Sequence, residues 1–193
     1  MLYAETLIVQ CAPGKMGGVL AALRPHVERA GLGCWTNEFG TLNRITLFRT
    51  SETLSFFDET PILGATDLPA GTGGTDRTRW RVVGDGVLPP GQHGPIYEWR
   101  CYDVATSRMA DMTAGFLSAL PRRLALSSLF AVMESLDGAA RFCHIWPYES
   151  LAQRTDIRRQ ATEAGIWPPA GAADNLTAMC SEIILSADFS AYR

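Results

Sequence analysis

The sequence predicts an α+β fold in which the order strand, helix, strand, strand, helix, strand occurs twice along 193 residues. Short runs with apolar residues at every second position alternate with segments whose apolar residues recur at helical spacing. A region rich in glycine and proline, residues 63–95, separates two halves of similar length. The halves also share similar short pieces, such as residues 20–23 and 117–120, which indicates an internal repeat.

The first half is expected to span residues 1–84. Its predicted elements are strand 2–10, helix 15–29, strands 34–38 and 43–49, a short helix through 56–57 and strand 79–83. Gly31-Leu32-Gly33 is expected to close the first helix, because glycine suits a helix C-terminus. Ser51 is interpreted as the N-cap of the short helix. Gly71-Thr72-Gly73-Gly74 lacks the Lys-Ser/Thr ending of a phosphate loop and is predicted to be a flexible loop.

A linker over residues 85–95 leads to a second half over 96–193. Its predicted elements are strand 96–102, helix 107–119, strands 129–134 and 141–146, a helix from about 148 to 159, a short helix around 175–179 and strand 181–185. Pro147 has no amide hydrogen and is expected to end its strand. Phe142, His144 and Trp146 alternate along that strand and should point to one face.

Composition narrows the classes of function. Hydrophobic residues make up 47% of the chain, which is enough for a core, and the net charge of −3 argues against nucleic-acid binding. The five cysteines are scattered without metal or redox spacing, so reduced thiols in a cytoplasmic protein are expected. No apolar run is long enough to insert into a membrane. None of the three histidines has a ligand neighbour at metal spacing, and we predict neither a metal nor a cofactor.

The twice-repeated order is the split-βαβ, or ferredoxin-like, plan. Four segments also resemble the NIPSNAP family. The most specific is His144-Ile145-Trp146-Pro147-Tyr148-Glu149-Ser150-Leu151, followed by Arg154 and Arg158. The others are Tyr97-Glu98-x-Arg100-x-Tyr102, residues 37–44, and the strand 182–185 before Phe189-Ser190. The resemblance covers both halves, strongly in the second and weakly in the first.

This resemblance implies the dimeric α/β-barrel superfamily, in which two ferredoxin-like sheets pack face to face. Here the tandem repeat is expected to supply both sheets from one chain. The superfamily includes cofactor-independent oxygenases, haem-degrading enzymes and small isomerases, beside members without known activity. Leu47 stands in the first half where His144 stands in the second, so a site is expected once per chain, around His144.

His144, Arg100 and Arg141 are the candidate catalytic residues. Imidazole can relay protons near neutral pH, and guanidinium groups can steady an anion. The candidate ligand-binding residues are Trp35, Arg44, Tyr97, Glu98, Tyr102, Phe142 and Trp146. Each also has a structural interpretation: a hydrogen-bonded core histidine, an ion-paired patch of Glu98 and Arg100 between the sheets, aromatic core packing, and turn-binding arginines.

Two hypotheses of function follow. The first is a protein that binds a small, partly apolar ligand or a protein partner. The second is a cofactor-independent oxygenase or isomerase that uses His144 as acid and base on a small carbonyl or aromatic substrate. A homodimer through an exposed sheet edge is a further expectation.

Overall fold

A computed structural model describes residues 1–64, 66–169 and 171–193. The first half contains β1 (Tyr3–Cys11), α1 (Met16–Ala30), β2 (Gly33–Phe39), β3 (Arg44–Ser51), α2 (Phe56–Glu59) and β4 (Thr72–Val82). The second half contains β5 (Ile96–Val104), the 3-10 turn η1 (Thr106–Arg108), α3 (Met109–Leu124), β6 (Ala131–Ser135), β7 (Arg141–Tyr148), α4 (Leu151–Glu163), the 3-10 turn η2 (Ala172–Asn175) and β8 (Leu176–Ser186). The predicted order of elements is confirmed in both halves.

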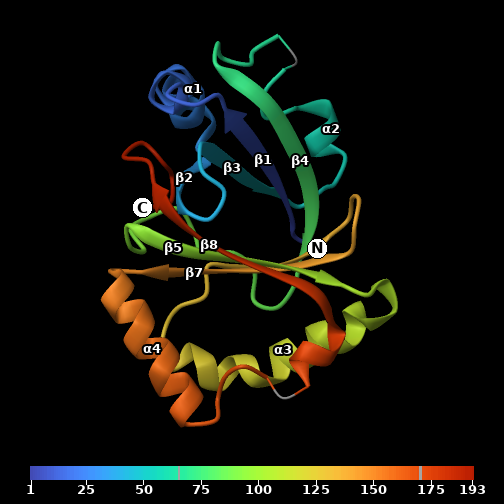
Figure 1. Cartoon of the computed structure of the whole chain (residues 1–193). Helices are drawn as coiled ribbons and strands as arrows, with labels where there is room; N and C mark the ends of the chain where they lie inside the picture. Colours follow the sequence, from blue (N-terminus) through green and yellow to red (C-terminus); the bar gives the residue numbers. More distant parts are fainter. Residues whose placement is uncertain (65, 170) are drawn as a thin grey trace.

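The eight strands form one closed barrel in the order β1-β3-β2-β8-β5-β7-β6-β4. Each half contributes four neighbouring strands in the ferredoxin-like order, and every pairing is antiparallel. The halves meet twice, where β2 pairs with β8 and β4 pairs with β6. Figure 1 shows α1 and α2 on one side of the barrel and α3 and α4 on the opposite side. The two predicted sheets therefore merge at both edges into a single barrel.

An aromatic cluster fills the inside of the barrel. The ring of Trp35 lies 5.4–6.1 Å from the rings of four neighbours, which are Phe48, Tyr97, Phe130 and Tyr192. Tyr192 comes from the irregular C-terminal tail, which folds back over Trp35. Edge-to-face aromatic pairs add to the apolar burial. The interior is thus a packed core shared by both halves.

The helices cover the outer faces of the strands through apolar stripes. Val19, Leu23 and Val27 form the buried stripe of α1, which ends where Gly31 adopts a left-handed φ of 61°. On the other side, Met112 and Phe116 of α3 pack against β7. Ser150 caps α4 by accepting a hydrogen bond from the backbone N–H of Gln153 at 3.1 Å. Each half therefore has its own outer core besides the shared interior.

Pro147 does not end its strand, contrary to the prediction. It lies within β7 opposite Tyr97, and the strand continues to Tyr148. The ladder between β6 and β7 already stops where Ala131 pairs with Ile145. The missing N–H of Pro147 therefore faces a side without a strand partner and costs no ladder bond.

Three further predictions of local structure are wrong. Ser51 ends β3 instead of capping α2, and its hydroxyl accepts the backbone N–H of Thr53. Thr72 to Gly74 belong to β4, because pairing with β1 continues as far as Cys11. Residues 176–179 begin β8, where Met179 pairs with Tyr102. In each case a ladder between distant segments outweighs local propensity.

The register of the strands shows which residues on the first strands of the two repeats are equivalent. Glu5 pairs with Arg49 between β1 and β3, and Glu98 pairs with Trp146 between β5 and β7. Leu47 of β3 corresponds to His144 of β7, so Arg49 corresponds to Trp146. Their strand partners Glu5 and Glu98 are therefore equivalent. Tyr3 is therefore equivalent to Ile96 and not to Tyr97, although Tyr3 and Tyr97 are both tyrosines near the start of a first strand. Both equivalent glutamates are only 1% exposed.

Barrel closure also bears on assembly. Each of the eight strands of the described chain has two strand neighbours, but β4 pairs with β6 only over Trp80–Val82, and β8 pairs with β2 only from Ile183 onward. The earlier parts of β4 and β8 therefore keep an exposed sheet edge. The homodimer through an exposed sheet edge stays a prediction. None of the helices in the described residues is long and apolar enough to cross a membrane. The division into domains at residues 85–95 stays a prediction.

Phe130→Ala should lower the free energy of unfolding by about 3–5 kcal/mol, because it opens a cavity in the shared aromatic core. Phe130 is fully buried and its ring lies 5.0 Å from Tyr192 and 5.3 Å from Phe48. Phe39→Ala is the matched control, since Phe39 is 53% exposed, and it should change stability by less than about 0.5 kcal/mol. Urea unfolding measures both, and equal effects would contradict the shared core.

Candidate functional site

A cavity of about 550 Å³ lies outside the barrel, between the strands β5 and β7 and the helices α3 and α4. Alternate residues of the two strands form its floor, on the face opposite the barrel core. The polar side chains that line it are Glu98, Arg100, Tyr102, Arg123, His144, Tyr148, Arg158 and Thr162. The apolar lining includes Met112, Phe116, Trp146, Trp167, Leu176 and Met179. The cavity therefore combines an aromatic wall with several charged groups.

Glu98 anchors the charged groups of the floor. Its Oε1 accepts hydrogen bonds from Arg154 at 2.5 Å, from the Ser181 hydroxyl at 3.0 Å and from Arg158 at 3.4 Å. The Nε of Arg100 lies 3.8 Å from the same oxygen. One buried carboxylate thus ties α4 to β5 and β8. The ion-paired patch expected between the two sheets lies instead between the sheet and a helix.

The charge balance around Glu98 is positive. Burial alone would raise the pKa of Glu98, but the hydrogen bond from Arg154 and the charges of Arg100 and Arg158 outweigh it and lower this pKa. Glu98 is therefore ionised at neutral pH. Among the described residues that line the cavity or contact Glu98, the charged groups are one carboxylate and four guanidinium groups, those of Arg100, Arg123, Arg154 and Arg158.

Arg123 of α3 is the least exposed of these cations, at 3%. It donates to the hydroxyls of Ser127 at 2.5 Å and Tyr148 at 3.2 Å, and its guanidinium carbon lies 4.3 Å from the centre of the Trp146 ring. No carboxylate of the described residues forms a salt bridge with it. A buried charge without a counter-ion is costly, so Arg123 is the least compensated group of this cavity.

His144 is held by its neighbour two residues along β7. The indole N–H of Trp146 donates a hydrogen bond to Nδ1 of His144 at 2.6 Å. An indole nitrogen can only donate, so Nδ1 carries the lone pair and the single ring proton sits on Nε2. The ring also packs against Phe116, at 4.9 Å between centroids, and Tyr102, at 5.2 Å. His144 is therefore fixed in one tautomer and one orientation.

The electrostatic surroundings keep His144 neutral. Burial, and then the charges of Arg100, Arg123 and Arg158, hold the pKa of His144 well below its ordinary value of 6.5. The one lone pair of the neutral ring is already used by Trp146. His144 can thus donate a hydrogen bond through Nε2–H, as an electrophilic group does, but it is poorly suited to accept a proton as a general base.

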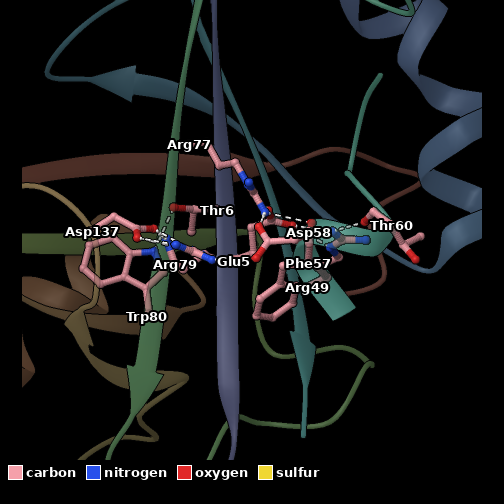
Figure 2. A network of polar contacts seen from close by, with 10 residues as sticks. All are labelled: Glu5, Thr6, Arg49, Phe57, Asp58, Thr60, Arg77, Arg79, Trp80 and Asp137. Atoms are coloured by element: carbon pink, nitrogen blue, oxygen red, sulfur yellow. Dashed lines mark hydrogen bonds and ion pairs between the residues drawn. The ribbon is translucent and has the colours of Figure 1, made fainter. Parts of the chain in front are cut away.

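The equivalent place in the first half is filled by protein. Figure 2 shows Glu5 between Arg49 and Arg77, which contact its two carboxylate oxygens. Arg77 also donates to the carbonyl of Phe57 at 2.7 Å, so the short helix α2 sits directly on this network. The position of His144 is occupied by Leu47, which is fully buried. The pattern of a buried glutamate is kept in both halves, while the histidine and the cavity around it belong to the second.

The network in the first half extends across the barrel surface. Arg79 binds Asp58 at 2.9 Å and Asp137 at 2.8 Å, which links α2 to the turn after β6 (Figure 2). Each guanidinium in this chain of contacts has a carboxylate within reach. This complete pairing contrasts with Arg123 in the second half and indicates a structural role for the first-half network.

The candidate residues from the sequence lie in the cavity, next to it or away from it. Glu98, Arg100, Tyr102, His144 and Trp146 line the cavity together. Phe142 lies beneath it, with its ring 5.0 Å from that of Phe116.

The other candidates lie away from the cavity. Trp35 and Tyr97 belong to the aromatic core of the barrel. Arg44 binds Gln10 and lies 3.6 Å from Glu182, and Arg141 donates to the hydroxyl of Thr78 at 2.7 Å.

Several cavity residues were not among the candidates, above all Arg123, Phe116 and Trp167. The sequence does contain a signal for Arg123. It continues the apolar stripe of α3 after Met112, Phe116 and Leu120, and an arginine on the buried face of a helix is rare unless it is paired. Trp167 carries no such signal, because its approach to His144 depends on the path of the chain after α4.

A protein-family model described as NIPSNAP matches residues 97–191. This half of the chain is similar to the NIPSNAP family. The matched range contains every residue that lines the cavity. A NIPSNAP family protein from Agrobacterium tumefaciens is 24% identical over 49% of this chain and 95% of that one, with a TM-score of 0.45. A search of curated proteins finds no match.

Solved structures similar over nearly the whole chain show the fold. A proposed monooxygenase from Lactobacillus acidophilus has a TM-score of 0.66 at 6% identity, covering 96% of this chain and 93% of that one. A proposed monooxygenase from Fusobacterium nucleatum has a TM-score of 0.65 at 9% identity, covering 96% and 92%. At these identities the likeness concerns the dimeric α/β-barrel fold alone. The NIPSNAP half is therefore one half of a closed barrel, and these solved structures have the same barrel fold over nearly their whole length.

His144 should make stability depend on pH in a defined window. Below its ordinary pKa of 6.5, His144 takes up a proton when the chain is unfolded but stays neutral when it is folded. The free energy of unfolding should therefore fall by about 1.4 kcal/mol for each pH unit below about 6.5, until the lowered pKa of the folded state is reached. Urea unfolding at about pH 7, 6 and 5 measures this slope.

His144→Asn is the informative variant. Asparagine offers an oxygen to the Trp146 indole but does not titrate, so the slope should shrink by the contribution of one proton. His26→Gln is the control, because His26 lies on the outer surface of α1 and contacts Arg29. An unchanged slope in His144→Asn would mean that His144 is not a buried neutral imidazole.

Proposed function

We propose that the NIPSNAP half binds a small, anionic, partly aromatic molecule in the cavity between β5, β7, α3 and α4. The observation that carries this proposal is Arg123, a buried guanidinium at the cavity that has hydroxyl and aromatic neighbours but no carboxylate partner among the described residues. An anion placed beside Arg123 would supply the missing counter-charge.

The remaining groups support the same class of ligand. The single charge of Glu98 is shared by Arg100, Arg154 and Arg158, so the cavity keeps a net positive charge to which Arg100 and Arg123 contribute. The Nε2–H of His144 adds a neutral donor between them on the floor of the cavity. Two guanidinium groups and one N–H donor suit a carboxylate, an enolate or a phenolate better than a neutral or cationic ligand.

The walls define the rest of the molecule. Phe116, Trp146 and Trp167 form a mutually packed aromatic surface, with ring centroids of Phe116 and Trp146 at 5.0 and 5.8 Å from that of Trp167. A cavity of about 550 Å³ falls within the usual range for small-molecule sites, roughly 300–1,000 Å³. A planar apolar body of one to three rings with an acidic group is therefore the expected ligand class.

A cofactor-independent enzyme is the second candidate. One observation favours it: a neutral imidazole donor and guanidinium groups line the same cavity, where they would stabilise an oxyanion formed from a phenol or carbonyl substrate. In this version His144 acts as a hydrogen-bond donor to the oxyanion and not as the acid/base first expected. The solved structures with the same fold include proposed monooxygenases, which makes oxygen consumption the assay to use.

Arg123→Met should separate binding from stability. The proposal predicts about a tenfold to hundredfold loss of affinity for aromatic carboxylates, the value of one charge-assisted contact. Stability without ligand should change by no more than about 1 kcal/mol, because an unpaired buried charge is removed. Isothermal titration with 1-naphthoate, 2-naphthol and 2-naphthylmethylamine, beside urea unfolding, tests both statements.

The control is Arg159→Met on α4, because the Arg159 side chain is 57% exposed and pairs with Glu163. It should leave affinity unchanged. Equal binding of the amine and the carboxylate, or full affinity in Arg123→Met, would overturn the anionic class. Native mass spectrometry of the purified protein gives an independent answer, since a retained acidic aromatic molecule would be released only on unfolding.

Oxygen uptake distinguishes the enzyme from the binding protein. With 2-naphthol or a hydroxyanthrone as substrate, the enzyme candidate predicts consumption of dissolved oxygen that His144→Asn reduces by about tenfold to a thousandfold, the range for loss of one oxyanion donor. Binding without any oxygen uptake above that of the free substrate would leave the ligand-binding function and exclude oxygenation of these substrates.

A further inference from the structure

Three cysteines that are far apart in the sequence lie in one row across the barrel wall. Cys101 of β5 pairs directly with Cys143 of β7 on one side and with Cys180 of β8 on the other. Directly opposed residues of antiparallel strands point to the same face, so all three thiols lie on the barrel side, away from the cavity. Cys143 is buried, Cys101 is partly buried and Cys180 is exposed.

The backbone hydrogen bonds show which pair is the closer one. The carbonyl of Ile145 accepts from Phe130 next to β6, so Ile145, and Cys143 two residues before it, turn their backbone groups toward β6. On β5, the N–H of Val104 donates to Ala140 beside β7, so odd-numbered Cys101 turns toward β8. Cys101 and Cys143 therefore form a non-hydrogen-bonded pair, the kind in which the Cα atoms are about 4.5 Å apart.

That geometry suits a disulfide. Cross-linked cysteines need Cα atoms about 4.4–6.8 Å apart and side chains that point toward one another. Cys101 with Cys180 is the wider, hydrogen-bonded pair, with Cα atoms about 5.5 Å apart.

The charged groups around the row make the two thiols unequal. The hydrogen bond from Cys143 lowers the pKa of Cys101 against the effect of burial, and the charge of Arg141 lowers it further, while Asp103 and Glu182 oppose this. Burial raises the pKa of Cys143. Cys101 is thus the more acidic and more accessible of the pair, which are the properties of a reactive thiol.

We propose that Cys101 is a peroxide-reactive thiol and that Cys143 resolves it to a disulfide between β5 and β7. This inference is independent of the ligand proposed for the cavity. It also gives a role to Arg141, which lies outside the cavity: it stabilises the Cys101 thiolate.

The chemistry balances with a hydroperoxide as the oxidant. The Cys101 thiolate attacks one peroxide oxygen, the O–O bond breaks, and Cys101 becomes a sulfenic acid while hydroxide leaves and takes up a proton. The sulfur of Cys143 then attacks the sulfenic sulfur. The S–S bond forms, the S–O bond breaks, and the departing hydroxide takes the Cys143 proton as water. Two thiols are oxidised by two electrons, and hydrogen peroxide is reduced to two waters.

Peptide mapping of the full chain tests the proposal directly. The protein is treated with a small molar excess of hydrogen peroxide, free thiols are blocked with N-ethylmaleimide, and the chain is cut with trypsin without reduction. Cleavage after arginine separates the three cysteines into peptides 101–108, 142–154 and 160–193. The expected product is peptide 101–108 joined to 142–154, with a mass equal to their sum less two hydrogens.

Variants identify the role of each cysteine. Cys180→Ser is the matched control and should form the same linked peptide at the same rate. Cys143→Ala should lose it and leave a Cys101 sulfenic acid that dimedone traps. Arg141→Met should slow formation of the link several-fold, because the fraction of Cys101 thiolate falls.

Three results with the native chain would contradict the proposal. A link between peptides 101–108 and 160–193, or oxidation confined to Cys180, would overturn the assignment of the pair. Unreacted Cys101 at peroxide levels that oxidise Cys180 would overturn the assignment of the reactive thiol. The mapping needs no variant to fold, so a destabilised Cys143→Ala protein does not affect these conclusions.

Discussion

Closure of the barrel is the constraint on which the rest of the structure depends. A ferredoxin-like sheet has one face for its helices and leaves the other bare, and here the bare faces of the two halves enclose a common aromatic core. Because β2 pairs with β8 and β4 pairs with β6, every strand of the described chain has two strand neighbours. Trp35 from the first half and Phe130 from the second meet inside it. Neither half could bury these rings alone, so folding of the two is coupled.

Closure also explains why the site lies outside the barrel. Because the interior is packed, space remains only between the strands and their covering helices. In the first half the short α2 lies on the salt bridges of Glu5 and fills that space. In the second half α3 and α4 are long enough to stand over the sheet around Glu98 without filling the gap. The two repeats thus share a buried glutamate and differ in what covers it.

The chemistry of His144 depends on a contact between side chains on one strand face. Alternation along β7 places Trp146 next to His144, and the indole N–H takes the imidazole lone pair. The surrounding arginines then oppose protonation. A histidine suggests a base by its type, but here the combined contacts favour a neutral donor. The same arginines that prevent its protonation create the positive field that would attract an anion.

Much of this was readable from the sequence. Periodicity predicted the α+β class and the repeated order of elements, because strand and helix patterns differ in period and survive divergence. The HIWPYESL segment with Arg154 and Arg158 indicated the family and led to His144, Glu98 and Arg100, which do lie together. The extent of β4, the course of β7 through Pro147 and the start of β8 were not predictable, since pairing with distant strands decides them.

The sequence by itself therefore determined the fold class, the family and the residue types of the cavity floor, because these follow from local pattern. Only the tertiary structure decided which charges remain unpaired and which thiols meet. Arg123 meets Tyr148 and no carboxylate of the described residues because of how α3 lies on β7. Cys101, Cys143 and Cys180 form a row because of the register of three strands. Both are relations between segments far apart in the chain, and no local spacing encodes them.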